Sequence, residues 1–364
     1  MKTVIFVVDS LSGGGAERVI VQLVNQVNRS RFVPILALGA ATGPYLREVR
    51  NDVVIHELGA RRSRSAVPAL VRTIRSVRPD VVVSTTGLNL AVSAARTFFP
   101  RNTRVILREG NTASAFLEDV ARAHPGHAKL YRAAYKRLYP RADAVICQSE
   151  FMRQDLAALG VPPRKLSCIY NPVDTARIKD LAGESPHASQ APGPHLVTMG
   201  RLAYQKGYDI LLRALAVIRE AHPRVFLSVI GDGEERADLE RMAEDLALRS
   251  SVEFTGFCAN PYPLVAGADL FVSSSRYEGF SNAIVEALAC GTPVVATDCP
   301  SANREVIEEG VNGWLAGTED HMSLAATVSR GLAERSRLDP RGIQERCEER
   351  FSVGRIVERY ERLF

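Results

Sequence analysis

The hydrophobic positions of this 364-residue chain fall into two alternating patterns. Short continuous runs of Val, Ile and Leu alternate with segments whose apolar residues recur at helical spacing. A continuous apolar run predicts a strand buried on both faces, as in a parallel sheet covered by helices. The predicted strands are 3–9, 32–38, 80–85, 103–109 and 142–149, followed by 195–201, 224–233, 252–257, 268–275 and 293–298. We therefore predict an α/β protein with two doubly wound domains.

Helical spacing predicts helices at 16–27, 67–77, 129–141, 283–289 and 353–364. The last of these has an apolar stripe at Ile356, Tyr360 and Leu363. The join between the two predicted domains falls at IYNPVD, residues 169–174, where Asn-Pro interrupts the pattern. The stretch that follows, 180–194, is rich in Pro, Gly and Ser and predicts a surface loop.

Composition places the chain among soluble globular proteins, with 46% hydrophobic and 24% charged residues. No apolar run approaches the roughly 20 residues that span a bilayer. The opening MKTVIFVVDS predicts a first strand and not a signal peptide, because Asp9 ends its short apolar run. The six cysteines form no CxxC pair, which favours reduced thiols in a cytoplasm and argues against a structural zinc site.

Charge is distributed unevenly along the chain. Residues 1–170 contain 25 Lys and Arg against 12 Asp and Glu, a net charge of +13, whereas the remainder has a net charge of −8. Such a contrast suggests two domains that face different partners. The basic half could meet an anionic membrane surface, a phosphate-bearing acceptor or nucleic acid.

One predicted helix in the basic half, KLYRAAYKRLYPR at 129–141, interleaves basic residues with large apolar ones. The apolar members are Leu130, Tyr131, Tyr135, Leu138 and Tyr139. A mixed basic and aromatic face is typical of docking on anionic lipid. The alternative is a helix that packs its tyrosines on the core and solvates its charges. We favour docking because the whole half is basic.

The stretch SRYEGFSNAIVEALACGTPVVATD, residues 275–298, contains two glutamates with seven residues between them. Glu278 lies in a glycine-containing loop, and Glu286 lies about one turn inside the predicted helix. Ser281 or Asn282 can cap this helix, whose N-terminal N–H groups and dipole attract anions. The loop lies at the C-terminal edge of the predicted parallel sheet, where ligands bind in this architecture. Two solvated surface acids and an ordinary cap are the alternative.

A second turn of interest, GRLAYQKG at 200–207, follows a predicted strand and contains Arg201 and Lys206. Two cations in one short loop suit a diphosphate, because Arg offers a fork of donors and Lys a point charge. For such a pair alone, a solvated basic turn is the favoured alternative.

Two glycine turns have the composition of ligand-binding loops. VIGDGEERADLE at 229–240 places Gly231 after a strand and before a helix, although a tight βα turn explains this equally well. SLSGGGAERVI at 10–20 places Gly14 and Gly15 before a helix, where the backbone can approach a ligand closely. It matches neither the dinucleotide fingerprint nor a Walker loop.

Taken jointly, these motifs resemble those of the retaining GT-B glycosyltransferases of family four. The resemblance covers essentially the whole chain and rests on motifs that follow in family order: SGGGAERV, NPVD, GRLAYQKG, IGDG, FTGF, SRYEGFSNAIVEALACGTPVVATD and NGWL. It implies two Rossmann-like domains facing a cleft, an acceptor-side domain at 1–171 and a nucleotide-sugar-binding domain at 172–350. It also implies a C-terminal helix at 351–364 that packs back on the first domain.

The resemblance also implies roles for single residues. Arg201 and Lys206 would hold the diphosphate and stabilise the leaving charge, and Glu278 would address the donor sugar. Glu286 would bind the ribose, and the backbone near Phe257 would frame the base. The full set of implied donor-binding residues is Gly14, Gly15, Gly231, Phe257, Gly279, Phe280, Ser281, Asn282 and Glu286.

One loop departs from the family pattern. Many members have a His after the first-domain strand that corresponds to TRVILRE, but none of the seven histidines lies there. The loop is REGNTAS, and we assign Arg108, Glu109 and Asn111 to acceptor or donor-sugar contacts. A capped, salt-bridged surface turn is the alternative. Because no D-x-D motif occurs, we expect no metal and no cofactor, with Arg201 and Lys206 in place of a divalent ion.

The leading hypothesis is a retaining glycosyltransferase of bacterial surface-glycan synthesis, peripheral on the cytoplasmic face of the cell membrane. It would move a hexose or N-acetylhexosamine from a nucleotide-sugar, a UDP-sugar before a GDP-sugar, to a lipid-linked or polysaccharide acceptor. A nucleotide-sugar epimerase or hydrolase of similar fold is the alternative. A non-catalytic protein that binds lipid or nucleic acid is a third hypothesis. The set Arg201, Lys206, Glu278 and Glu286 argues against it, and we expect no nucleic-acid partner.

Overall fold

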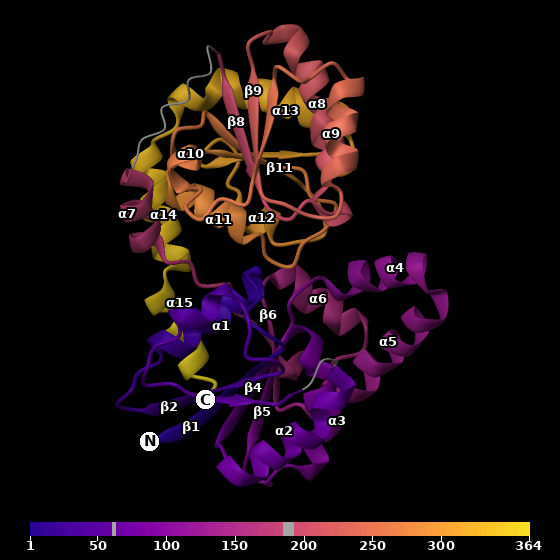
Figure 1. Cartoon of the computed structure of the whole chain (residues 1–364), viewed down its shortest axis with the longest axis vertical. Helices are drawn as coiled ribbons and strands as arrows, with labels where there is room; N and C mark the ends of the chain where they lie inside the picture. Colours follow the sequence, from indigo (N-terminus) through magenta and orange to yellow (C-terminus); the bar gives the residue numbers. More distant parts are fainter. Residues whose placement is uncertain (60–62, 185–192) are drawn as a thin grey trace. The chain divides into compact units, whose positions relative to one another are not determined.

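The computed structural model describes residues 1–59, 63–184 and 193–364, which form two compact units (Figure 1). The first unit comprises Met1–Pro172 and Val353–Phe364, and the second comprises Val173–Ser352. The domain limits expected from the sequence fall one or two residues earlier, at 171 and 350.

The first unit is a parallel sheet between two layers of helices. Its strands are β1 (Lys2–Val8), β2 (Phe32–Leu38), β3 (Val54–Glu57), β4 (Val81–Thr85), β5 (Arg104–Arg108), β6 (Ala144–Cys147) and β7 (Leu166–Cys168). Its helices are α1 (Gly15–Gln26), α2 (Ser63–Val77), α3 (Asn89–Ala95), α4 (Ala113–Ala123), α5 (Pro125–Leu138), α6 (Glu150–Ala158) and α15 (Val353–Glu361). The strand order β3-β2-β1-β4-β5-β6-β7 reverses between β1 and β4, which is where ligands bind in such sheets.

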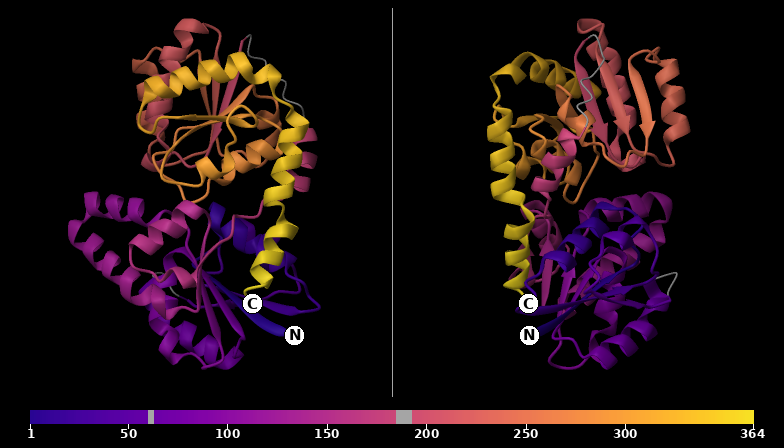
Figure 2. Two further views of the ribbon diagram at one scale, coloured as in Figure 1. Left: turned by 180° about the vertical axis from the view of Figure 1, so that it is seen from behind. Right: turned by 60° about the vertical axis from the view of Figure 1, so that its left-hand side comes forward.

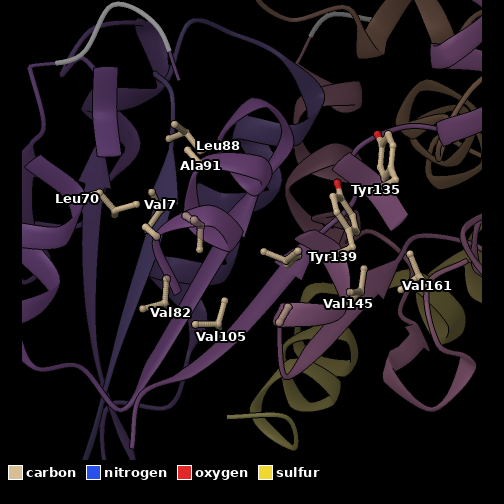
Figure 3. Packing of buried hydrophobic residues seen from close by; sticks show 14 of the residues in the cluster. Val7, Leu70, Val82, Leu88, Ala91, Val105, Tyr135, Tyr139, Val145 and Val161 are labelled. Atoms are coloured by element: carbon tan, nitrogen blue, oxygen red, sulfur yellow. The ribbon is translucent and has the colours of Figure 1, made fainter. Parts of the chain in front are cut away.

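Successive residues of β1 point to opposite faces of the sheet and enter two different cores. Ile5 and Val7 pack with apolar residues of α2, α3, α5 and α6 (Figure 3). Val4, Phe6 and Val8 pack with residues of α1 and α15. The continuous apolar runs of the sequence therefore correspond to strands buried on both sides, as predicted.

Helix α15 is fixed to the first unit by apolar and polar contacts. Ile356 and Tyr360 are buried in the same core as α1, and Phe364 meets Phe6 edge to face at a centroid distance of 6.0 Å. Glu361 accepts a hydrogen bond from the backbone N–H of Asn28 at 2.7 Å. The predicted stripe is therefore the packed face, although its third member, Leu363, is only partly buried.

The second unit is also parallel, with helices on both faces of its sheet (Figure 2). Its strands are β8 (His195–Met199), β9 (Phe226–Ile230), β10 (Val252–Gly256), β11 (Leu270–Ser273), β12 (Val294–Thr297) and β13 (Gly313–Ala316). Its helices are α7 (Thr175–Gly183), α8 (Tyr208–Ala221), α9 (Arg236–Asp245), α10 (Tyr262–Ala266), α11 (Asn282–Ala289), α12 (Asn303–Val306), α13 (His321–Glu334) and α14 (Pro340–Phe351). The strand order is β10-β9-β8-β11-β12-β13.

The structure differs from the sequence predictions at several elements. The strands β3, β7 and β13 were not predicted, because each is short and has no apolar run longer than three residues. The predicted loop at 180–194 is wrong for its first residues, since α7 continues to Gly183. Residues 185–192 of that loop lie outside the described residues.

The favoured interpretation of the basic helix is wrong for its aromatic residues. Tyr135 of α5 and Tyr139, which begins the turn after this helix, are both buried in the core, as Figure 3 shows. Tyr131 is partly buried and packs edge to face on Phe116. Leu130 is 69% exposed, and the exposed basic residues around it leave a charged surface without an aromatic face.

We predict that Ile356→Ala lowers the free energy of unfolding by about 2–5 kcal/mol, because the cavity left in the core is added to the lost burial. Urea denaturation measures this change. The neighbouring Arg355→Ala is the matched control, since Arg355 is exposed on the same helix; its change is expected within about 0.5 kcal/mol. Equal effects of the two substitutions would contradict the docking of α15.

Candidate functional site

The site in the second unit begins where β8 ends. The chain turns through Gly200 to Lys206 and enters α8 at Gly207, which has a left-handed φ of 61°. A Cβ at Gly207 would lie 2.3 Å from the carbonyl oxygen of Ser274, so only glycine allows this approach. The close approach places Lys206 beside the loop that follows β11.

Lys206 and Glu278, which the sequence singled out, form an ion pair. The Nζ of Lys206 lies 2.5 Å from Oε1 of Glu278, and the Oγ of Ser275 donates to the same oxygen at 2.8 Å. Glu278 is only 6% exposed. Gln205 donates from Nε2 to the carbonyl of Tyr277 at 3.0 Å, which ties the two loops together again. A buried carboxylate is tolerable here because a cation and hydroxyl compensate it.

Helix α11 begins at Asn282, four residues after Glu278. Ser281 occupies the N-cap position, but its side chain makes no cap hydrogen bond, so the expected capping bond is absent. Ser281, Lys206 and Tyr208 line a cavity of about 10 Å³ beneath the loop, which has room for about one water molecule. Glu286 lies in the second turn of α11 and is 6% exposed.

The remaining predicted donor-binding residues of this unit differ in exposure. Phe280 packs edge to face on Phe351 at 5.7 Å, so its ring belongs to the core and only its backbone can serve a ligand. Gly279 is buried, Asn282 is half-buried and Phe257 is 82% exposed. The predictions for these residues stay untested.

Arg201 and Gly231 lie beside the same sheet edge. Arg201 is exposed, and its guanidinium has no ion-pair partner among the described residues. Gly231 has a φ of 133°, and a Cβ there would lie 2.0 Å from the carbonyl oxygen of Gly200. A close backbone approach therefore requires this glycine whether or not it also contacts a ligand.

The glycine loop of the first unit already has an anion bound to its backbone. Oε2 of Glu17 accepts hydrogen bonds from the N–H groups of Gly13 and Gly14 at 2.8 and 2.7 Å. Asp9 lies close enough that Glu17 adds to the rise in its pKa, of which burial is the main cause. Gly15 begins α1, and the donor-binding roles of Gly14 and Gly15 stay predictions.

In the first unit, Arg108 ends β5 and is fully buried. Its Nη1 donates to Oγ1 of Thr85 at 2.9 Å, and its Nη2 donates to Oδ1 of Asn171 at 2.6 Å. These contacts tie the ends of β4 and β5 to the segment that leaves the unit. They favour a structural role for Arg108, whose assignment to acceptor contacts stays a prediction.

Glu109 is a buried acid at the same strand end. It accepts a hydrogen bond from the hydroxyl of Tyr139 on Oε2 and one from the N–H of Gly110 on Oε1 at 2.9 Å. Burial raises the pKa of Glu109 above its ordinary value of 4.5, although these donors oppose the rise. Asn111 is half-buried and accepts from the N–H of Thr112 at 3.0 Å. The alternative of a salt-bridged surface turn is therefore wrong for Glu109.

Comparison with known families identifies the chain. Residues 13–177 match the family "Glycosyltransferase Family 4", and residues 185–349 match "Glycosyl transferases group 1". The chain belongs to glycosyltransferase family four. The two matched ranges contain the glycine loop of the first unit and the Lys206–Glu278 pair of the second.

This glycosyltransferase is similar to curated proteins along most of its length. It is 28% identical over 354 residues to the lipopolysaccharide core biosynthesis glycosyltransferase LpsE of Rhizobium meliloti, with 95% of this chain and 94% of the relative covered. It is 26% identical over 335 residues to the N-acetylgalactosamine-N,N'-diacetylbacillosaminyl-diphospho-undecaprenol 4-alpha-N-acetylgalactosaminyltransferase of Campylobacter jejuni, covering 86% of each chain. These similarities do not favour the epimerase or hydrolase alternative.

The fold is that of GT-B glycosyltransferases. The crystal structure of Anabaena HepE in complex with UDP superposes with a TM-score of 0.81 at 22% identity, covering 100% of this chain and 99% of that one. The predicted architecture of two Rossmann-like domains, with a C-terminal helix returning to the first, is confirmed.

Sequence reasoning missed several residues that contact the candidate site residues. Ser275 and Arg276 stand three and two residues before Glu278 within SRYEGF, so their position was a usable signal. Glu17 and Tyr139 gave no such signal, since an acid on a helix and a tyrosine in a basic helix are common.

Within the described residues, no group of three or more His, Cys, Asp or Glu side chains is placed to hold a metal ion. Among the described helices, none has the length and apolar character to span a bilayer.

We predict that Glu109→Gln changes the pH dependence of stability. An acid whose pKa is raised by folding favours the folded state below its unfolded pKa, and this contribution is lost as pH rises through the folded pKa. Wild type should therefore lose stability relative to Glu109→Gln as pH rises above about 4.5.

Urea denaturation from pH 4 to pH 8 measures this difference. Glu118→Gln on α4 is the matched control, because Glu118 is exposed, and it should show no such trend. If wild type keeps or gains stability relative to Glu109→Gln as pH rises, the buried, proton-binding carboxyl is contradicted.

Proposed function

We propose that this glycosyltransferase moves a hexose or N-acetylhexosamine from a nucleotide-sugar to a lipid-linked or polysaccharide acceptor in bacterial surface-glycan synthesis. The observation that carries the proposal is the Lys206–Glu278 pair at the N-terminus of α11. The named activities of the two bacterial relatives support the acceptor class. The UDP bound to the structural neighbour supports a UDP-sugar before a GDP-sugar.

The chemistry follows from the charges that the reaction develops. Breaking the anomeric C–O bond leaves positive character on the sugar and negative charge on the diphosphate. The ammonium of Lys206 and the exposed guanidinium of Arg201 would stabilise the diphosphate, helped by the N–H groups of the first turn of α11. The carboxylate of Glu278 would face the donor sugar, and Glu286 would accept hydrogen bonds from the ribose hydroxyls.

Retention of the anomeric configuration is part of the proposal. The acceptor hydroxyl would attack from the face that the diphosphate leaves, forming the new C–O bond as the old one breaks. Its proton would pass to a departing phosphate oxygen. Lys206 and Arg201 would supply the charge that a divalent ion supplies in other transferases, so the reaction would proceed without metal.

We predict that Lys206→Ala lowers kcat about 10²- to 10³-fold, because one fixed charge aimed at the leaving diphosphate is lost. Transfer from a panel of UDP- and GDP-sugars to an oligosaccharide or polyprenyl-linked acceptor, with and without EDTA, measures it. Glu278→Gln should also abolish most transfer. Lys179→Ala is the matched control, because Lys179 pairs with Glu348 at 3.0 Å in the same unit.

Full activity of Lys206→Ala and Glu278→Gln would contradict the assigned site. Activity that EDTA removes and added metal restores would contradict the metal-independent chemistry. Rapid release of sugar without acceptor would point to a hydrolase.

We also propose that the first unit docks on an anionic membrane surface on the cytoplasmic side, through the exposed basic residues of α5. The net charge of +13 over residues 1–170 supports this, as does the exposed Leu130 between Lys129 and Arg132. Attraction between exposed charges is screened by salt.

We predict that binding to phosphatidylglycerol vesicles weakens as salt rises and that neutral vesicles bind little. Vesicle co-sedimentation measures both. Charge reversal on α5 by Lys136→Glu and Arg137→Glu should weaken binding. The matched pair Arg241→Glu and Arg249→Glu in the second unit changes the net charge equally and should have a smaller effect. Salt-independent binding, or equal effects of the two pairs, would contradict the docking surface.

A further inference from the structure

Arg276 lies two residues before Glu278 and touches the loop that contains Lys206. Its backbone N–H donates to the carbonyl of Gln205 at 2.8 Å. Its Nη1 donates to the carbonyl of Tyr204 at 2.8 Å. One residue of the loop after β11 therefore holds two successive carbonyls of the turn that ends in Lys206.

The rest of the guanidinium is saturated by acids and an aromatic ring. Nη1 and Nη2 contact the two carboxylate oxygens of Asp209 at 2.9 and 2.7 Å, and Nε donates to Glu319 at 3.0 Å. The guanidinium carbon lies 4.1 Å from the centroid of the Tyr204 ring. The side chain of Arg276 is only 12% exposed.

These contacts need arginine in particular. A planar fork can meet a carboxylate with two parallel hydrogen bonds, stack on a ring and still donate from Nε. A lysine at this position has three donors but no planar fork, so it could not pair bidentately with Asp209 and stack on the Tyr204 ring at the same time. Arg276 is held by Asp209 of α8 and by Glu319 in the loop before α13, and it contacts the turn through the ring and carbonyl of Tyr204.

We propose that Arg276 is a positioning residue of the donor site, which sets the place of Lys206 relative to Glu278. It acts through the backbone of the Tyr204–Lys206 turn and touches neither charged group of the pair. Oγ of Ser274 also holds the backbone of this turn, by donating a hydrogen bond to the carbonyl of Lys206 at 2.9 Å. This inference rests on the proposed function, because it assigns Lys206 to the diphosphate.

The alternative is an ion pair that contributes only to the stability of the unit. Arg335 offers a matched case: its Nε contacts Asp269 at 2.8 Å, and it donates to the carbonyl of Leu332. It therefore combines a carboxylate and a carbonyl as Arg276 does, but away from the Lys206–Glu278 pair.

The test compares Arg276→Lys, Arg276→Ala and Asp209→Asn with the control Arg335→Ala in the full-length chain. Calorimetry measures the Kd for UDP, and steady-state kinetics separate kcat from KM for the UDP-sugar that wild type uses. We expect the Arg276 variants to weaken UDP binding and lower kcat/KM about 10- to 100-fold, because a displacement near 1 Å costs this much. Asp209→Asn should shift both in the same direction, and Arg335→Ala should change both less than about twofold.

A double-mutant cycle separates positioning from stability. In the Lys206→Ala background, Arg276→Lys should have little further effect on UDP binding, since the group that it positions is gone. Thermal melting identifies variants that fail to fold, and Arg276→Lys keeps the test valid if Arg276→Ala does so. Wild-type UDP affinity and kcat/KM in Arg276→Lys, or an undiminished effect in the Lys206→Ala background, would overturn the inference.

The two proposals fail in different ways. If wild type binds no UDP, GDP or nucleotide-sugar, the proposed function is wrong and this inference falls with it. If wild type binds UDP and Lys206→Ala weakens that binding while Arg276→Lys does not, the proposed function stands and only the inference is overturned.

Discussion

The candidate site of the second unit depends on the ion pair between Lys206 and Glu278. Their charged atoms are 2.5 Å apart, and Glu278 is almost fully buried. A buried charge is costly unless a partner compensates it, so each member of the pair holds the other in place. Gly207, in its left-handed conformation, and the hydrogen bonds of Arg276 hold together the two loops that contain this pair. The two members of the pair are 72 residues apart in the sequence.

Most of the architecture could be predicted from the sequence, because strands buried on both faces have continuous apolar runs. Three strands escaped prediction for a physical reason: β3 lies at one edge of its sheet and exposes Val54 and Ile55, β7 has three residues, and β13 has four. The tyrosines of α5 were misjudged because a basic helix with aromatic residues has the same spacing whether its rings meet a core or a lipid surface. Tertiary packing decided between the two.

The candidate site was predictable where function is concentrated in a motif and hidden where it depends on tertiary contacts. Lys206, Glu278 and Glu286 stand in recognisable stretches. The burial of Arg108 against Thr85 and Asn171 follows from how three separate segments meet, which no local pattern encodes. The same holds for Glu17, whose carboxylate occupies the N–H groups of Gly13 and Gly14. A glycine turn can therefore have the geometry of an anion-binding loop while a carboxylate of the same chain occupies its N–H groups.

The first unit is assembled from two segments that lie far apart in the sequence, Met1–Pro172 and Val353–Phe364. The ammonium group of Lys2 donates to the carbonyl of Phe364 at 2.7 Å, and α15 completes the core that β1 begins. During synthesis on the ribosome, residues 1–172 emerge long before residues 353–364. Part of one face of their sheet therefore stays uncovered until α15 has been made. The second unit, by contrast, is continuous in sequence and can fold as soon as it has been made. The unit whose strands are translated before the second unit is thus completed after it, and a chain that ended before Val353 would leave apolar surface exposed.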